Sequence, residues 1–416
     1  MLGEPHGYWL AGQRIGGVRA RCRAVPGTVG EPMYLIRLIL RNALRHRLRT
    51  LLTIVGLVVA TVAFGLLQTV VDAWYAGANA ASSARLVTRH AVSLVFFLPV
   101  NYRDKLRRID GVRAVAAGNW FGGIYKEPKN FFPQFAIDAD YVAMYPEYVL
   151  AENQMNDWVR DRKGAVVGRK LAQTYGFRIG DTVTIKGTIF PGNWDFVIRG
   201  IYDGREPSTD TSQFFFHWEY LNQTMKATVP RRADLAGWFV LELTDASRAA
   251  EVSRSVDALF RNSNAETLTE TEKAFQLGFV AMTEAIVVVI RAVSFLVIFI
   301  IMAVMANTMA MTARERLSEY ATLKALGFGH GFIALLIFGE SLAIAAIGGL
   351  LGMLATWPIA RAFADAMGSL FPVFNVSGET VAMQAAAACL VGLIAALVPS
   401  WKAMHVRIVD GLRSVG

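Results

Sequence analysis

The sequence predicts an α+β membrane protein: four transmembrane helices, with a large α+β extracytoplasmic domain inserted between the first and the second. Three observations lead to this prediction. The chain contains four long apolar runs with almost no charge, each about the 20 residues needed to cross the core of a bilayer. One run stands near the start, a gap of about two hundred residues follows, and three runs crowd at the end. The chain is also 54% hydrophobic, above the roughly 45–50% of soluble globular proteins.

The four apolar runs give the spans in order. They are Leu51–Val71, Ala292–Met311, Phe332–Trp357 and Val381–Trp401. With their flanks they predict transmembrane segments over 51–75, 281–311, 332–358 and 381–401. The remaining segments of the second half are a loop over 312–331, a short external loop over 359–380 and a tail over 402–416.

The charge distribution predicts which side of the membrane each segment faces. The formal net charge is +9, and nine arginines against Glu4 and Glu31 place +7 of it before the first run. These arginines are Arg14, Arg19, Arg21, Arg23, Arg37, Arg41, Arg45, Arg47 and Arg49. An excess of basic residues beside a span marks the cytoplasmic side, so we interpret it as the signal of a cytoplasmic N-terminus and expect no nucleic acid partner. Four spans then return the C-terminus to the cytoplasm and place the large domain outside.

The segment before the first span divides in two. Residues 1–32 are rich in Gly and Arg without apolar periodicity, so we expect them to be disordered or to result from a mis-set start codon. Over 33–50, apolar residues recur at helical spacing, and Arg37, Arg41 and Arg45 lie four residues apart on another face. This pattern predicts an amphipathic helix at the cytoplasmic membrane interface. A plain basic flank of the first span is the alternative.

The inserted domain, residues 76–280, mixes helical and strand patterns, with helical stalks at both ends. Helices are predicted over Tyr102–Ile109, Val166–Tyr175, Ala246–Asn262 and Leu268–Glu284, with a charged loop over Asp157–Gly164. Strands are predicted from Gly111, over Thr182–Lys186, Phe196–Tyr202 and Trp238–Leu243. Two aromatic runs, Phe131–Phe135 and Phe214–Tyr220, fit buried strands better than an exposed substrate surface.

The sequence offers no constellation for catalysis or metal binding. Cys22 and Cys389 lie too far apart in the predicted topology to pair, and the Cys spacing does not suggest a metal site. The histidines are scattered without metal-ligand spacing. The ATP-binding pattern G-x-x-x-x-G-K-[ST] does not occur. We therefore predict a non-catalytic chain with neither a metal nor a cofactor of its own.

Polar residues and glycines near the spans suggest sites within the membrane. Glu340 lies inside the third span, and an intramembrane carboxylate is by default a functional-site hypothesis; structural pairing within the bundle is the preferred interpretation over proton coupling. Arg291, where the domain meets the second span, is expected to extend to the outer interface. Gly348 and Gly352 form a small-xxx-small face that permits close helix packing.

The loop between the second and third spans carries the most specific motif. Residues 312–327 read TARERLSEYATLKALG. This resembles the loop of FtsX/MacB-type ABC transporter permeases, whose pattern is close to E-R-x-R-E-I-G-x-L-[RK]-A-[LI]-G. The matching residues are Glu315, Arg316, Glu319, Leu323, Lys324, Ala325, Leu326 and Gly327, whereas Ser318, Tyr320 and Ala321 depart from the pattern. The tail from Pro399 to Arg413 is similar to the family's closing pattern, and the resemblance extends over residues 33–416.

The resemblance implies that this loop is a coupling helix that sits in a groove of a partner ATPase. We expect Tyr320, Leu323 and Leu326 to form an apolar anchor on one side, with a charged rim elsewhere. The predicted coupling residues are Glu315, Arg316, Glu319, Tyr320, Leu323, Lys324, Leu326 and Gly327. A charged loop resting on the membrane surface is the alternative from the residues alone.

The resemblance also implies a function and a set of partners. The chain would be the permease subunit of an ABC transporter in the bacterial inner membrane, paired with an identical or paralogous second permease. Two copies of a P-loop ATPase would bind ATP and Mg²⁺ and move the external domains, a process called mechanotransmission. The transporter would export or extract a lipid, lipoprotein, peptide or hydrophobic compound, with or without a periplasmic adaptor or accepting protein. The alternatives are an FtsX-like regulator of a cell-wall hydrolase, and an ATPase-independent scaffold or receptor.

Overall fold

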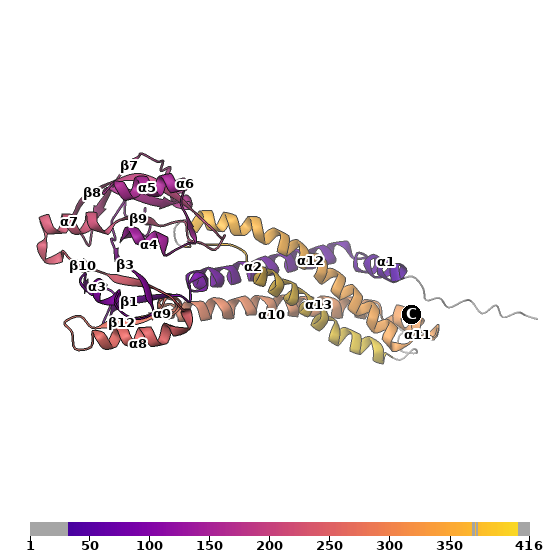
Figure 1. Ribbon diagram of the computed structural model, residues 1–416. Helices are drawn as coiled ribbons and strands as arrows, with labels where there is room; N and C mark the ends of the chain where they lie inside the picture. Colours follow the sequence, from indigo (N-terminus) through magenta and orange to yellow (C-terminus); the bar gives the residue numbers. More distant parts are fainter. Residues whose placement is uncertain (1–31, 368–370, 372, 407–416) are drawn as a thin grey trace, which may run out of the picture.

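The computed structural model describes residues 32–367, 371 and 373–406. The molecule is elongated, with an α+β domain at one end and a bundle of long helices at the other (Figure 1). The N-terminal segment expected to be disordered or mis-started lies outside the described residues except for Pro32, and Cys22 lies outside them as well.

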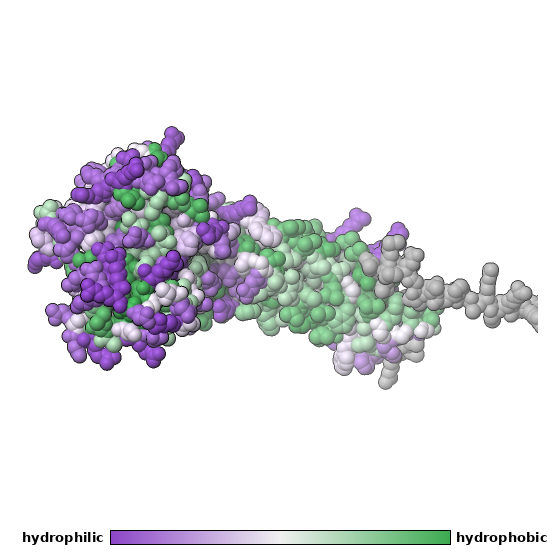
Figure 2. Space-filling view, viewed as in Figure 1, coloured by the Kyte–Doolittle hydropathy of each residue, from purple (hydrophilic) through white to green (hydrophobic). Residues whose placement is uncertain are grey.

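Within the described residues, four helices are long and apolar enough to cross a membrane. They are α2 (Arg47–Ala80), α10 (Glu284–Glu315), α12 (His330–Met367) and α13 (Gly378–His405). Each of the four apolar runs lies inside one of these helices. Apolar side chains cover the surface of this bundle, whereas polar side chains dominate the surface of the α+β domain (Figure 2). The predicted fold class is therefore confirmed.

Small residues set the packing of the bundle. Helices α10 and α12 both pack against α2 and α13. A Cβ atom added to Gly348 would lie 2.6 Å from the Cβ of Leu57, and one added to Gly352 would lie 2.6 Å from the Cβ of Thr61. The small-xxx-small face of α12 thus lies directly against α2, where no larger side chain fits without movement.

The prediction of one continuous helix over residues 33–50 is wrong, because the structure has two helices there with a turn between them. Helix α1 spans Pro32–Ala43, and α2 begins at Arg47. The hydroxyl of Thr50 donates a hydrogen bond of 2.6 Å to the carbonyl oxygen of Ala43. This bond satisfies a carbonyl at the end of α1 and fixes the turn between the two helices.

The α+β domain contains twelve described strands and eight shorter α- and 3₁₀-helices up to α8, with the stalk helix α9 closing it. The strands are β1 (Arg85–His90), β2 (Leu98–Pro99), β3 (Val112–Trp120), β4 (Gln134–Ile137), β5 (Tyr148–Val149), β6 (Gly164–Gly168), β7 (Thr182–Gly187), β8 (Gly192–Gly204), β9 (Phe214–His217), β10 (Leu235–Ala236), β11 (Trp238–Leu243) and β12 (Thr267–Thr271). The helices are α3 (Tyr102–Leu106), α4 (Ala139–Ala143), α5 (Glu152–Arg160), α6 (Arg169–Tyr175), α7 (Trp218–Thr228), α8 (Ala249–Leu259) and α9 (Glu272–Met282), with 3₁₀ turns at Pro230–Arg232 and Ala246–Arg248.

One large sheet joins two lobes of the domain. Its strand order is β12-β1-β11-β3-β4-β9-β6-β8-β5, with β7 paired to β8. Strands β12, β1, β11 and β3 come from the two ends of the domain's chain, so they form the lobe connected to α2 and α10. The middle of the chain forms the other lobe, which contains β5 to β9.

The aromatic runs build much of the core. Phe132, Phe214, Phe215 and Phe216 are all fully buried, and strand β9 carries three of them. The preference for buried strands is confirmed for Phe214, Phe215 and Phe216, whereas Phe132 is buried just before β4 begins. Phe131 differs, since its side chain is exposed.

Three predicted elements of the domain are wrong. Val166 to Gly168 belong to the fully buried strand β6, and helix α6 starts only at Arg169. The first half of the predicted loop over 157–164 is the end of helix α5, whose Trp158 is buried against the sheet. The predicted helix from Leu268 begins as edge strand β12, and α9 starts at Glu272, where the side chain of Thr271 caps it by accepting a hydrogen bond from the backbone N–H of Ala274.

Candidate functional site

The predicted coupling loop lies at the end of the bundle remote from the α+β domain (Figure 1). Its short helix α11 spans Leu317–Ala325 and is separated from α10 by a break in helical conformation at Arg316. After α11 the chain turns at Gly327, whose φ of +92° is a conformation open mainly to glycine. These two breaks let α11 fold back against the bundle before α12 begins.

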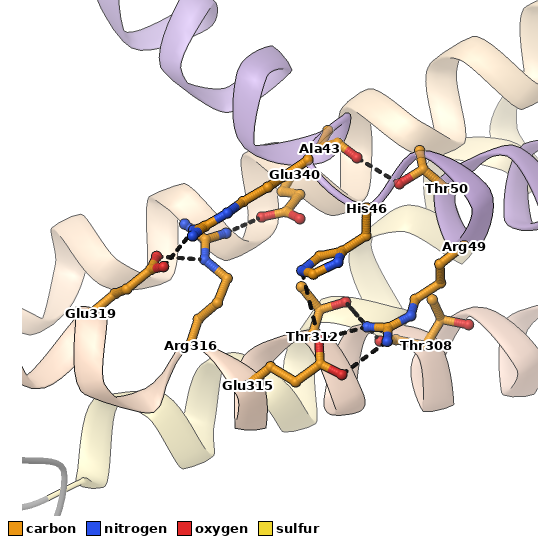
Figure 3. A network of polar contacts seen from close by, with 11 residues as sticks. Ala43, His46, Arg49, Thr50, Thr308, Thr312, Glu315, Arg316, Glu319 and Glu340 are labelled. Carbon is orange, nitrogen blue, oxygen red and sulfur yellow. Dashed lines mark hydrogen bonds and ion pairs between the residues drawn. The ribbon is translucent and has the colours of Figure 1, made fainter. Parts of the chain in front are cut away.

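Arg316 is the centre of an ion network that extends from the bundle interior to its surface (Figure 3). Its Nη1 donates to Oε2 of Glu340 at 2.8 Å, and its Nε donates to Oε2 of Glu319 at 2.9 Å. The side chains of Arg316 and Glu340 are only 8% and 6% exposed. Arg45, in the turn between α1 and α2, donates to the other carboxylate oxygen of Glu319. The network therefore connects α12, α11 and the start of α2.

A second ion cluster joins α2 to α10 (Figure 3). Arg49 donates to both carboxylate oxygens of Glu315, at 2.9 and 2.8 Å. His46 places its Nε2 3.7 Å from Glu315. A bidentate arginine–carboxylate pair fixes orientation as well as distance, so the ends of α2 and α10 are held in register.

The charge of Glu319 is stabilised by its two partners. Partial burial acts to raise the pKa of this carboxyl group, but the guanidinium groups of Arg316 and Arg45 outweigh burial and hold the pKa below its usual value. Glu319 thus stays ionised at neutral pH and keeps both ion pairs.

Two further side chains fix α11 to the bundle. Tyr320 is fully buried among apolar residues of the bundle, and burial raises the pKa of its hydroxyl to about 12. The guanidinium carbon of Arg316 lies 5.5 Å from the centre of the Tyr320 ring. Lys324 donates from Nζ to the backbone oxygens of Met404 and Val406, at 2.7 and 2.8 Å. Helix α11 is thus held by α12 and by the end of α13.

The turn after α11 is apolar and exposed. The side chain of Leu326 is 71% exposed and that of Phe328 is 40% exposed, on either side of Gly327. Leu323 is half-buried and packs against the core of the bundle. We call residues 325–329 the exposed turn.

The structure divides the predicted coupling set into two groups. Leu326 and Gly327 lie in the exposed turn, and Glu315 and Glu319 are partly exposed at the other end of α11. The prediction that Tyr320 belongs to an exposed apolar anchor is wrong, because its position in α11 turns the ring toward the bundle. Arg316 is buried too, so it cannot lie on an exposed rim. The sequence reasoning missed Phe328, although the apolar run Leu-Gly-Phe at the end of the motif was a signal.

The remaining predicted residues lie elsewhere. Glu340 faces the bundle interior, where Arg316 neutralises it. Arg291 is exposed on the eighth residue of α10, near the α+β domain. In the described part of the chain, no group of three His, Cys, Asp or Glu side chains could hold a metal ion. The ion pairs around α11 hold the helices together, and the charged groups in them pair with one another.

Two family models match this architecture. The MacB-like periplasmic core domain matches residues 50–259, half of the chain, and the FtsX-like permease C-terminal matches residues 291–408. The chain belongs to the FtsX/MacB-type ABC transporter permeases. The second match includes α11 and the Arg316, Glu319 and Glu340 members of the ion network, and the first includes most of the α+β domain.

Individual relatives are more distant. A stretch of 108 residues is 35% identical to the uncharacterized ABC transporter permease YvrN of Bacillus subtilis (strain 168), and it covers 26% of this chain and a quarter, 25%, of that relative. The extracellular domain of the noncanonic ABC-type transporter YknZ from Gram-positive bacteria is similar over 45% of this FtsX/MacB-type chain and 100% of its own, with 11% identity and a TM-score of 0.33.

Proposed function

We propose that this permease couples ATP hydrolysis in a separate P-loop ATPase to movement of its α+β domain. The observation that carries the proposal is the exposed turn: Leu326 and Phe328 extend from a short helix that buried contacts fix to the bundle. A docking surface needs apolar anchors on a rigid base, because flexible anchors lose entropy on binding. Glu315 and Glu319, partly exposed at the other end of α11, supply polar groups on the same short segment.

Long helices connect the exposed turn with the domain. Helix α10 runs for 32 residues from the domain to α11, which is about 48 Å at 1.5 Å per residue. Helix α2 runs beside it for 34 residues. The Arg49–Glu315 pair joins the two at the remote end. A displacement at the turn would therefore move both helices and the lobe of the sheet connected to them.

The proposal includes an orientation and a set of partners. The end with α11 carries Arg45, Arg47, Arg49 and Arg314, so by the positive-inside rule it faces the cytoplasm of a bacterial inner membrane. Two ATPase copies would bind ATP and Mg²⁺ there. A second permease, identical or paralogous, would complete the transporter, and an external adaptor or accepting protein would take the substrate. The substrate would be a lipid, lipoprotein, peptide or hydrophobic compound.

A pull-down from the native membrane in mild detergent tests the proposal. We expect a P-loop ATPase to copurify in about equal amount, and Leu326→Asp to abolish this association because a charge would enter an apolar contact. Leu44→Asp is the control, since Leu44 is also exposed and lies at the same end of the bundle, in the turn between α1 and α2. Recovery of the chain without any ATPase, while a control ABC complex stays intact, would contradict the proposal and favour a scaffold. An ATPase together with a cell-wall hydrolase would instead support the FtsX-like regulator.

A further inference from the structure

The α+β domain contains a large cavity that none of the contacts above uses. Its volume is about 750 Å³, and it lies between the stalk helix α9 and the sheet face formed by β1, β11, β3 and β4. Val87 and Val240 lie on its floor, and Phe275 and Phe279 of α9 form a wall. We call this space the aromatic cavity. It stands at the base of the domain, since α9 leads within two residues into α10 (Figure 1).

Flat aromatic faces line much of the aromatic cavity. Tyr141, Tyr145 and Tyr148 form a stack, with ring centroids 4.5 and 5.5 Å apart and interplanar angles of 17° and 13°. Phe135 and Trp238 meet edge to face at 5.8 Å. Such contacts hold the rings in fixed positions before any ligand arrives. The cavity therefore offers preformed surfaces for stacking.

The wall on α9 adds two more rings. Phe275 and Phe279 are four residues apart, so both face the same side of the helix, and their rings meet edge to face at 5.1 Å. The side chain of Phe279 is 45% exposed. A ligand that enters the cavity would remove part of the Phe279 ring from water. Burial of apolar surface is favourable, so this contact would stabilise the bound ligand.

The carboxylate that lines the aromatic cavity, Glu272, already has partners. Glu272 accepts hydrogen bonds from Nε of Arg85 at 2.7 Å and from the backbone N–H of Ser82 at 3.0 Å. Arg85 also lies 4.0 Å over the ring of Tyr145 and pairs with Glu147. Burial raises the pKa of Tyr141, Tyr145 and Tyr148, so their phenols stay neutral. Arg232, which also lines the cavity, donates to the backbone oxygen of Ile189, so each charged side chain of the lining already has a partner.

The shape of the site favours a small molecule over an extended peptide. The floor is the face of internal strands, whose backbone groups are paired with neighbouring strands. Peptides that add to a sheet need free backbone groups at an edge strand, and the floor offers none. The volume falls within the roughly 300–1,000 Å³ of cavities that enclose drug-sized ligands.

We propose that the aromatic cavity binds a neutral, apolar small molecule of drug size that carries aromatic rings. Binding itself is independent of any ATPase. The assignment of this molecule as the transported substrate class rests on the proposed function. Because α9 forms a wall of the cavity and continues into α10, an occupied cavity would fix the position of the stalk relative to the sheet.

The test uses the full chain in lipid nanodiscs, without ATPase or nucleotide. The probe is N-phenyl-1-naphthylamine, a neutral apolar fluorophore, and the signal is energy transfer from tryptophan, since Trp120 and Trp238 line the cavity. We expect saturable transfer above that of empty nanodiscs. Phe279→Glu should raise the apparent Kd by about tenfold, because it places a charge in the apolar wall.

The control is Leu277→Glu, which lies on the same helix, is 37% exposed and does not line the cavity; its apparent Kd should stay near that of the native chain. Val240→Phe, which places a larger side chain on the floor of the cavity, should also weaken binding. If Val240→Phe fails to fold, Phe279→Glu alone decides the outcome. Equal affinity in Phe279→Glu and Leu277→Glu, or no saturable signal, would overturn the site. If the probe binds but leaves ATP hydrolysis by the assembled complex unchanged, the substrate assignment is overturned while the binding site stands. Failure of Leu326→Asp to release an ATPase would contradict the proposed function alone.

Discussion

At the scale of single residues, the Arg316–Glu340 pair explains how this bundle accommodates a carboxylate. Charged groups removed from water are stable only when a partner compensates them. Here Nη1 of Arg316 and Oε2 of Glu340 lie 2.8 Å apart, both side chains are buried, and the second carboxylate, Glu319, is shared with Arg45. The network contains two positive and two negative groups, so loss of either Arg316 or Glu340 alone leaves a net charge in it.

We predict that breaking this pair destabilises the chain more than removing it. Arg316→Met or Glu340→Met alone should lower the free energy of unfolding by about 3–5 kcal/mol, because each leaves an uncompensated charge in the network. The double variant R316M/E340M should recover much of that loss. Thermal unfolding in detergent, followed by tryptophan fluorescence, measures the difference.

Arg314→Met is the matched control for this cycle, since Arg314 is exposed two residues from Arg316, and its effect should stay within about 0.5 kcal/mol. A double variant as unstable as the sum of the two single variants would show that the residues act independently.

The sequence indicated both members of this pair but not their contact. Glu340 was expected to find a structural partner, and Arg316 was assigned to the docking surface instead. The two are 24 residues apart, and they meet only because α11 folds back along the bundle. No periodicity within one helix encodes that turn. The contacts of Arg45 and Arg49 were missed for the same reason, since they depend on how separate helices meet.

At the scale of elements, spans and short strands differed in how predictable they were. Twenty apolar residues in a row have few alternatives to a membrane helix, so all four spans were predicted from length and composition. Strand β6 is buried at every position, so it lacks the alternation that distinguishes a half-buried strand. Helix α5 was not predicted, because only Trp158 among its side chains is buried and its charged residues give no apolar periodicity.

We predict that the glycines on α12 are needed for packing against α2. Gly348→Ala and Gly352→Ala should each lower the free energy of unfolding by about 1–3 kcal/mol, because the new methyl group would lie 2.6 Å from the Cβ of Leu57 or Thr61 and the helices must separate. Equilibrium unfolding in mixed detergent measures the change. Gly331→Ala is the control on the same helix, since an added Cβ there would have nothing within 4 Å; it should be neutral or stabilising by up to about 1 kcal/mol. Equal losses at all three positions would contradict the packing argument.

At the scale of the whole molecule, Trp74 lies where the domain, the stalk and the bundle meet. From α2, its indole Nε1 donates to the hydroxyl of Thr283 at 2.6 Å, at the joint between α9 and α10. Its ring packs edge to face on Phe371, with centroids 5.5 Å apart. The backbone oxygen of Phe371 accepts a hydrogen bond from Lys170 of the middle lobe, at 2.9 Å. Trp74 therefore contacts both the joint between α9 and α10 and the segment around Phe371, and these two segments connect the bundle to the domain.

Both lobes of the domain connect to the membrane helices near Trp74. The lobe formed by the ends of the domain's chain continues covalently into α2 and, through α9, into α10. The middle lobe reaches the bundle through Lys170 and through Asn375, whose amide nitrogen donates to the backbone oxygen of Pro207 at 2.8 Å. Movement of α2 relative to α10 would therefore shift the two lobes by different routes, and the Trp74–Thr283 bond limits that movement.

We predict that Trp74→Phe loosens the stalk without unfolding the domain. Phenylalanine keeps an apolar ring against Phe371 but cannot donate to Thr283, so the joint between α9 and α10 loses the bond that holds it to α2. Amide hydrogen exchange over residues 276–290 should become faster, because local opening there becomes easier, while exchange in the core strands β6 and β9 should not change. Trp401→Phe, at the remote end of α13 and exposed, is the control and should leave both regions unaffected. If exchange accelerates equally in the stalk and in the core strands, Trp74 stabilises the fold as a whole; only a selective effect on the stalk fits a bond that restrains how the bundle moves the domain.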